Sequence, residues 1–142
     1  MQTREPGQLV VGKYRLIRLL GQGGVGSVWH AQHLALNAPV ALKFIEGERL
    51  NAAAQQRFLE EARKAAALSS PHVVKILDCG VEEGVPHLAM ELLEGETLAA
   101  RLERDQRLGL AETTRVVQHV ARAIARAHDA GMIHRDLKPA NV

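Results

Sequence analysis

The stretch "LLGQGGVGSV", Leu19 to Val28, is the most informative part of the sequence, because its four glycines separate two apolar segments. Glycine has no Cβ, so glycines at this spacing let backbone N–H groups approach phosphate oxygens closely. An ordinary glycine-rich hairpin has the same composition. So does the dinucleotide-binding fingerprint, in which a helix opens at the glycines. The conformation after Gly26 therefore separates these interpretations.

A dinucleotide site is the main competing interpretation of the glycines. Glu46 follows them by about 20 residues, where that fingerprint has its ribose-binding acid. The residues directly after Gly26, "SVWH", are β-branched and aromatic, and Pro39 follows soon after. They favour a strand, whereas a dinucleotide-binding oxidoreductase requires a helix at this point.

On both sides of the glycines, short apolar segments bounded by glycine and proline predict an antiparallel sheet. Longer alanine-rich or amphipathic segments predict helices. Five strands are expected at 14–20, 27–31, 39–45, 73–80 and 85–93, and helices at 51–70, 98–104 and 110–131. The turn-like "VEEG" predicts that the last two strands form a hairpin. The fold class is therefore α+β, with a five-stranded sheet and one helix preceding a helical part.

The helices of the second part carry their own boundary signals. Thr97 is an expected N-cap, and Gly131 is an expected C-terminal stop for the long helix. Apolar residues recur at helical spacing on one face of that helix, opposite a polar face. The apolar face comprises Val116, Val117, Val120, Ile124 and Ala127.

Bulk composition limits the class of protein. The chain has 142 residues, 46% of them hydrophobic, and a formal charge of +2, which is too small to indicate a nucleic-acid or membrane-surface partner. The single cysteine, Cys79, cannot form an internal disulfide, which is consistent with a protein of a reducing compartment. The start resembles no signal peptide and no stretch is long and apolar enough to span a membrane, so we expect a cytoplasmic protein.

A lysine in an apolar strand is the second notable feature. In "VALK" the strand period places Ala41 and Lys43 on one face. Lys43 is either an edge-strand lysine reaching water or the partner of a buried acid. Glu61 lies about 60° from Phe58 around the following helix, beside its apolar stripe, where an acid needs a cation. It either bends out to solvent or pairs with Lys43.

The third feature is the polar stretch "HRDLKPANV", His134 to Val142, after the long helix. Asp136, Lys138 and Asn141 together offer a proton acceptor, a cation and a metal ligand, which are the groups that phosphoryl transfer requires. A solvated polar turn broken by Pro139 is the alternative. His134 is expected to be a packed structural imidazole rather than a base.

Together these motifs resemble the eukaryotic-like serine/threonine protein kinase family, in its order and at its separations. The resemblance implies that the glycine loop covers the phosphates of ATP, that Lys43 contacts the α- and β-phosphates while paired with Glu61, and that Asp136 accepts the substrate proton. It further implies that Lys138 neutralises the transferred phosphoryl group, that Asn141 binds Mg²⁺, and that the substrate is a serine or threonine of a protein. The implied nucleotide-binding residues are Leu20, Gly21, Gln22, Gly23, Gly24, Val25, Gly26, Val28, Ala41, Lys43, Met90, Glu91 and Leu93.

The resemblance also implies domain limits. Residues 1–13 are expected to be an extension and 14–142 an incomplete kinase domain, with an N-lobe at 14–90, a hinge at 91–95 and the start of a C-lobe at 96–142. The family's "DFG" segment and activation loop are absent from this sequence. The isolated chain is therefore expected to be poorly stable and inactive. A non-catalytic module that binds nucleotide or a partner is the alternative function.

Overall fold

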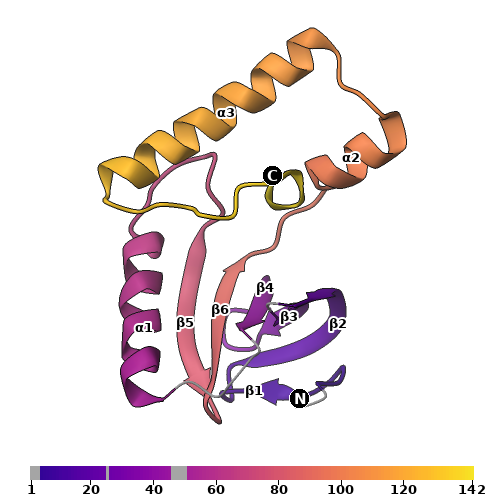
Figure 1. Ribbon diagram of the computed structural model, residues 1–142. Coiled ribbons are helices and arrows are strands. Elements are labelled where there is room, and N and C mark those ends of the chain that lie inside the picture. Colours follow the sequence, from indigo (N-terminus) through magenta and orange to yellow (C-terminus); the bar gives the residue numbers. More distant parts are fainter. Residues whose placement is uncertain (1–3, 25, 46–50) are drawn as a thin grey trace. The chain divides into compact units, whose positions relative to one another are not determined.

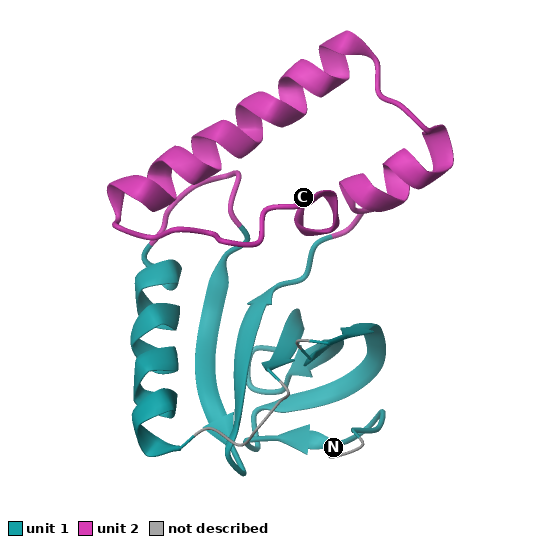
Figure 2. Ribbon diagram, in the orientation of Figure 1, with its two compact units in different colours: residues 1–67, 74–93 teal, residues 68–73, 94–142 magenta. Residues whose placement is uncertain are grey.

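A computed structural model of the chain describes residues 4–24, 26–45 and 51–142. The chain divides into two compact units, each described here by itself (Figure 2). Unit 1 comprises residues 1–67 and 74–93, and unit 2 comprises residues 68–73 and 94–142. The change of unit after Leu93 falls inside the expected hinge, but residues 68–73 lie with the helices, not with the sheet.

Unit 1 is built on a six-stranded antiparallel sheet in the order β1-β2-β3-β4-β6-β5 (Figure 1). The strands are β1 (Leu9–Val10), β2 (Tyr14–Gly23), β3 (Gly26–His33), β4 (Ala38–Ile45), β5 (Ile76–Glu82) and β6 (Val85–Glu91). The five predicted strands are present, and the α+β class is confirmed. The two-residue β1 was not predicted, since it lies in the segment expected to be an extension and is too short for an alternating pattern.

The core of unit 1 follows from the strand period. Val40, Leu42 and Phe44 alternate along β4 and are buried on one face of the sheet. They join residues from the neighbouring strands in one hydrophobic cluster. Its members are Val10, Tyr14, Leu16, Trp29, Ala31, Val40, Leu42, Phe44 and Ala89.

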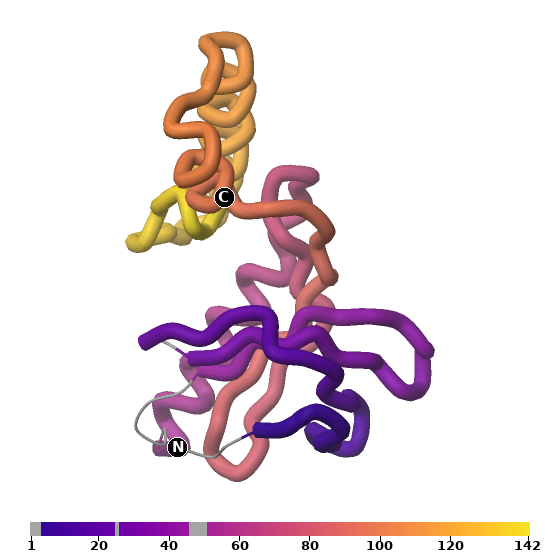
Figure 3. The backbone as a smooth tube through the Cα atoms, turned by 90° about the vertical axis from the view of Figure 1, so that its right-hand side faces the viewer, coloured from indigo at the N-terminus to yellow at the C-terminus, as the bar shows by residue number. Residues whose placement is uncertain are grey.

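Side-chain hydrogen bonds tie the two edges of this sheet together. The Tyr14 hydroxyl and the Lys13 ammonium both donate to Asp78 Oδ2 on β5, over 2.9 and 3.1 Å. The Val11 N–H donates to the Glu82 carboxylate, and β1 lies beside the β5–β6 hairpin (Figures 1 and 3). The sheet is therefore strongly curled, with its first and last strands linked.

The same contacts change two pKa values. Burial, then the hydrogen bond to Asp78, raises the pKa of Tyr14. Burial alone would raise the pKa of Asp78, but the Lys13 and Tyr14 donors outweigh it and hold that pKa below its usual range. The carboxylate at the junction of the sheet edges thus stays ionised.

The β5–β6 hairpin confirms the predicted turn. Glu83 and Gly84 have φ angles of 50° and 82°, and a two-residue type I′ hairpin turn requires positive φ at both positions. Glu82 pairs with Val85 across it. The turn fixes the register of both strands.

Helix α1 (Ala52–Ala66) is capped at its N-terminus by Asn51, whose side chain accepts the Ala54 N–H over 2.9 Å. It ends at Ala66, inside the predicted stretch 51–70 and ahead of the stop signals Ser69, Ser70 and Pro71. Of the expected apolar stripe, Ala62 is buried, while Phe58 is half-buried. The helix packs against β5.

Unit 2 contains α2 (Leu98–Asp105), α3 (Leu110–Asp129) and a 3₁₀ turn, η1 (Pro139–Asn141). Thr97 caps α2 as predicted, accepting the Ala100 N–H over 3.2 Å, and Gly131 follows α3 with a φ of 72°. His72 stacks on His119 of α3, with ring centroids 4.3 Å apart, and so attaches the segment 68–73.

The apolar face of α3 is narrower than predicted. Val116, Val120 and Ile124 are half-buried, whereas Val117 is 60% exposed. No described residue of unit 2 is fully buried. Within the described ranges, no helix has the length and apolarity needed to cross a bilayer.

Candidate functional site

The glycine stretch forms the tip of the β2–β3 hairpin. Gly23 pairs with Gly26, and β3 begins at Gly26. The prediction of a strand there is confirmed, and the dinucleotide interpretation, which requires a helix, is wrong. Val25 and Glu46 lie outside the described residues.

The backbone of this tip is open to a ligand. A Cβ built on Gly21, Gly23 or Gly24 would meet no atom within 4 Å, and both Leu20 and Gln22 are exposed. Gly26 has a φ of 140°, a conformation that side-chain-bearing residues rarely adopt. An anion could approach the N–H groups here without displacing protein atoms.

Four predicted nucleotide-binding residues share one face of three neighbouring strands. Val28 is paired with Lys43 across β3 and β4, and Ala41 is paired with Met90 across β4 and β6. Directly paired residues project to the same face, and Ala41 and Lys43 are two residues apart, so all four lie together. This face is opposite the hydrophobic core. Ala41 is only 7% exposed, so the face is already well covered there.

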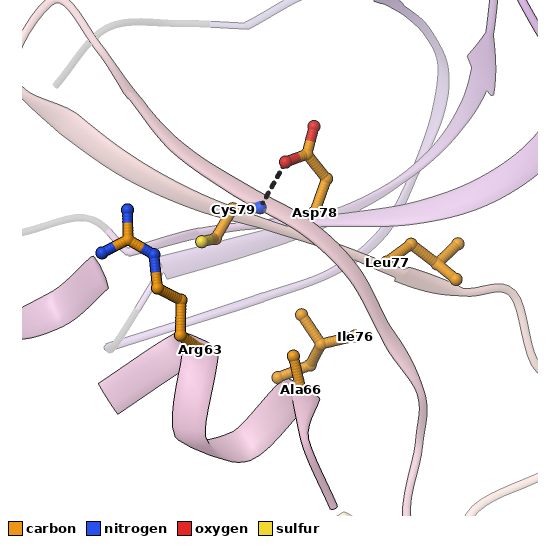
Figure 4. Close-up of a pocket in the computed structure, with 6 residues that line it drawn as sticks. All are labelled: Arg63, Ala66, Ile76, Leu77, Asp78 and Cys79. Atoms are coloured by element: carbon orange, nitrogen blue, oxygen red, sulfur yellow. Dashed lines mark hydrogen bonds between the residues drawn. The ribbon is translucent and has the colours of Figure 1, made fainter. Parts of the chain in front are cut away.

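Helix α1 lies on the same side of the sheet as Lys43. Lys43 and Cys79 are both paired with Leu88, so their side chains share a face. Figure 4 shows Cys79 pointing toward Arg63 of α1, in a pocket of about 300 Å³ that Ala66 also lines. An acid on α1 could therefore reach Lys43 without crossing the sheet.

The expected ion pair between Lys43 and Glu61 is not formed in the described part of the chain. Glu61 is exposed, and among the described residues these two side chains form neither an ion pair nor a hydrogen bond. The physical reason is the rotation of α1: Arg63, about 200° from Glu61 around the helix, faces β5. The pairing stays a prediction.

The end of β6 has an unusual connection to β5. The Glu91 N–H donates to the Lys75 carbonyl over 3.0 Å. The Lys75 N–H donates to Glu91 Oε1 over 2.7 Å. Two residues on, Leu93 is 67% exposed. Sequence reasoning missed the role of the Glu91 side chain, because nothing in the local pattern joins residues 16 positions apart.

In unit 2, three predicted residues meet at one carboxylate. Lys138 Nζ lies 2.9 Å from Asp136 Oδ2, and Asn141 Nδ2 donates to the Asp136 carbonyl over 2.8 Å and to Oδ2 over 3.3 Å. The hydrogen bond from Lys138, followed by that from Asn141, lowers the pKa of Asp136. The arrangement is a carboxylate held ionised next to a cation and an amide.

Local backbone structure holds this group in place. Pro139 opens the η1 turn that carries Asn141, and Arg135 has a φ of 62°. The Val142 carbonyl accepts the Leu98 N–H over 2.8 Å, which satisfies an otherwise unpaired donor at the start of α2.

His134 differs from expectation, because it is exposed rather than packed. Its carbonyl accepts the Asp136 N–H over 2.9 Å, and its Nδ1 lies 3.3 Å from the same N–H. The segment is short and local, so this residue positions the backbone of Asp136 instead of filling a core.

This site can support chemistry on an anion. Asn141 donates through Nδ2, which leaves its Oδ1 as an acceptor, and amide and carboxylate oxygens are the ligands that Mg²⁺ prefers. The ionised Asp136 can accept a proton or orient a hydroxyl. The residues present therefore fit a magnesium-bound phosphate group.

The protein kinase domain family matches residues 14–142. The chain is 37% identical to the serine/threonine-protein kinase PknA of Mycobacterium tuberculosis over 142 residues, covering 96% of this chain and 33% of that protein. It is 38% identical to the serine/threonine-protein kinase pkn3 of Myxococcus xanthus over 138 residues, covering 96% of this chain and 25% of that protein.

Among solved structures, the kinase domain of M. tuberculosis PknI superposes with a TM-score of 0.85 at 31% identity. That match covers 99% of this chain and 57% of the other. The chain thus spans a third or less of the full length of the two curated relatives. With the strand after Gly26 and the Asp136 cluster in place, this chain belongs to the protein kinase domain family.

Proposed function

We propose that the chain carries the nucleotide-binding sheet and catalytic loop of an ATP-dependent serine/threonine protein kinase, which transfers a phosphoryl group to a protein hydroxyl. The observation that carries the proposal is the Asp136 carboxylate with Lys138 Nζ at 2.9 Å and the Asn141 amide beside it. Phosphoryl transfer needs positioned charges and metal ligands more than covalent chemistry; Asp136 and Lys138 supply two charges, and Asn141 supplies a neutral amide.

Asp136 is the proton acceptor in this proposal. Its pKa is lowered, so the carboxylate is ionised at neutral pH and can orient the attacking hydroxyl and take its proton. Lys138 contacts the same carboxylate oxygen, and in this proposal its ammonium group neutralises charge on the transferred group. Serine and threonine are the proposed acceptors because Lys138 is typical of that branch of the family.

The sheet face carrying Val28, Ala41, Lys43 and Met90 is the proposed nucleotide site. In this proposal the half-buried Val28 and Met90 offer the apolar surface to adenine, with the buried Ala41 beside them. Lys43 offers a cation to the phosphates. The open glycine tip would cover the phosphates with backbone N–H groups. Mg²⁺, held through Asn141, would supply neutralising charge for the phosphate oxygens.

One observation favours the alternative, a module that binds nucleotide without transfer. Lys43 and Glu61 are not paired, and that pair is part of the active arrangement in the family. The isolated chain is expected to be inactive under either interpretation, because this sequence lacks the family's "DFG" segment. The two functions differ in transfer, not in nucleotide binding.

The test combines binding with transfer. Titration of the 142-residue chain with a fluorescent ATP analogue and Mg²⁺ measures binding, and incubation with labelled ATP and a generic basic protein measures transfer. Asp136→Asn should lower transfer by about 10²- to 10⁴-fold and leave binding nearly unchanged. Glu103→Ala, which removes one exposed charge from α2, is the control.

Transfer that depends on Asp136 supports the kinase and overturns the expected inactivity of the isolated chain. Binding without transfer agrees both with that inactivity and with the nucleotide-binding module. Absence of nucleotide binding overturns both functions.

We place the protein in the cytoplasm, where ATP is abundant and the free thiol of Cys79 stays reduced.

A further inference from the structure

The connection between the end of β6 and the residue before β5 departs from an ordinary antiparallel ladder. In a hydrogen-bonded pair of such a ladder, two opposite residues exchange both N–H···O bonds. Glu91 and Lys75 stand opposite each other, one step beyond the Ile76–Met90 pair. Only half of the exchange is made between backbones, from the Glu91 N–H to the Lys75 carbonyl at 3.0 Å.

The other half is made by a side chain. The Lys75 N–H donates to Glu91 Oε1 at 2.7 Å, so the carboxylate takes the place of the residue's own carbonyl. A charged acceptor makes a stronger hydrogen bond than a neutral carbonyl does, which favours the substitution. The Glu91 carbonyl is thereby left without this donor and can accept a hydrogen bond from another molecule.

The surrounding register supports this arrangement. The β5–β6 pairing shifts between Ile76 and Asp78, so Leu77 is an extra residue that bends β5 next to the strand end. On the other side, Glu91 is the last β6 residue paired with β4, opposite Val40. The freed carbonyl therefore lies at the rim of the sheet, next to Met90 of the nucleotide face.

We infer that the Glu91 carboxylate is a positioning residue that reserves the Glu91 carbonyl for an amino-bearing base by holding the Lys75 N–H itself. The inference rests on the proposed nucleotide site, and it adds a role for a side chain that contacts no nucleotide. Removal of the carboxylate lets the Lys75 N–H return to the carbonyl of residue 91. The site then loses an acceptor and its preference for a base with an exocyclic amine.

Base preference is the first measurement. Dissociation constants of ATP and of purine riboside triphosphate, which lacks the 6-amino group, are measured for the 142-residue chain and its variants. The wild type should favour ATP, and Glu91→Ala should reduce that preference by about three- to tenfold, the range of one hydrogen bond. Glu91→Gln keeps an oxygen acceptor and should retain the preference, and Glu103→Ala controls for loss of one exposed negative charge.

A second measurement needs no nucleotide. The scalar coupling across a hydrogen bond, from the Lys75 amide nitrogen to the carbonyl carbon of residue 91, reports by NMR whether that carbonyl is occupied. We expect no coupling in the wild type or in Glu91→Gln, and a coupling in Glu91→Ala.

The outcomes separate this inference from the proposed function. A wild-type coupling to the Glu91 carbonyl overturns the inference, and so does a Glu91→Ala variant that keeps the full preference for ATP. If the wild type binds neither nucleotide, the proposed function fails, and the NMR result alone decides whether the carboxylate frees the carbonyl.

Discussion

The two units are each stabilised by a different kind of contact. Unit 1 contains every fully buried residue that the structure describes, gathered around β4. The described part of unit 2 has none, and relies on the Thr97 cap, on ring stacking and on ion pairs such as Arg104 with Glu96 and Arg101 with Asp105. Hydrophobic burial contributes far more per residue than exposed ion pairs do, so the sheet should tolerate conditions that loosen the helices.

Core truncation should show the largest difference between the units. Leu42→Ala removes a fully buried side chain and should lower the free energy of unfolding of unit 1 by about 2–5 kcal/mol. Val120→Ala removes a half-buried side chain of α3 and should cost about 1 kcal/mol. Urea unfolding followed by amide hydrogen exchange on β4 and on α3 measures both, and equal losses would refute the contrast.

Loss of the acid that links the sheet edges should have the next largest effect. Asp78→Ala leaves the buried Tyr14 hydroxyl and Lys13 without their acceptor and should destabilise unit 1 by about 1–3 kcal/mol. Trp29, the only tryptophan, is buried in this core and reports unfolding by fluorescence. Asp129→Ala on α3 is the matched control and should leave the Trp29 transition unchanged.

A cap substitution tests unit 2 separately. Thr97→Ala removes the acceptor for the Ala100 N–H and should destabilise α2 by about 1 kcal/mol. Amide exchange at Ala100 should accelerate, while Trp29 fluorescence should not respond. Thr97→Ser keeps a hydroxyl and should behave like the wild type. A Trp29 response to Thr97→Ala would mean that the units do not respond independently.

The smallest effect concerns pH. His87 is 2% exposed between Phe44 and Tyr14, and burial lowers its pKa below 6.5, so the folded chain keeps it neutral. The unfolded chain binds a proton more readily, so unit 1 should lose stability as pH falls below about 6.5, and no loss arises from this group above it. His87→Leu should flatten the dependence of Trp29 unfolding between about pH 7 and 5. A profile unchanged by that substitution would contradict this assignment.

Local rules predicted much of the fold. Strand alternation in "PVALKFI" predicted that Ala41 and Lys43 share one face, and the structure has Leu42 buried on the other. The cap rules predicted the roles of Thr97 and Gly131. The cluster of Asp136, Lys138 and Asn141 could also be predicted from the sequence, because its members lie within six residues.

Features that depend on distant partners could not be predicted in this way. The strand β1 exists because it pairs with β2 and because Val11 reaches Glu82, 71 residues later. The bond from Lys75 to Glu91 likewise depends on the register of two strands. The angle of Glu61 on its helix was known, but whether it meets Lys43 depends on how α1 rotates against β5.

The link between the sheet edges affects where a laboratory fragment of this protein should start. The family match begins at Tyr14, and a fragment cut there would retain the glycine stretch, Lys43 and the Asp136 cluster. It would nevertheless discard Val10 from the hydrophobic cluster and Lys13 from its contact with Asp78. A fragment that starts at Tyr14 should therefore have a less stable sheet, cut more readily by proteases, than a fragment that starts at Glu5.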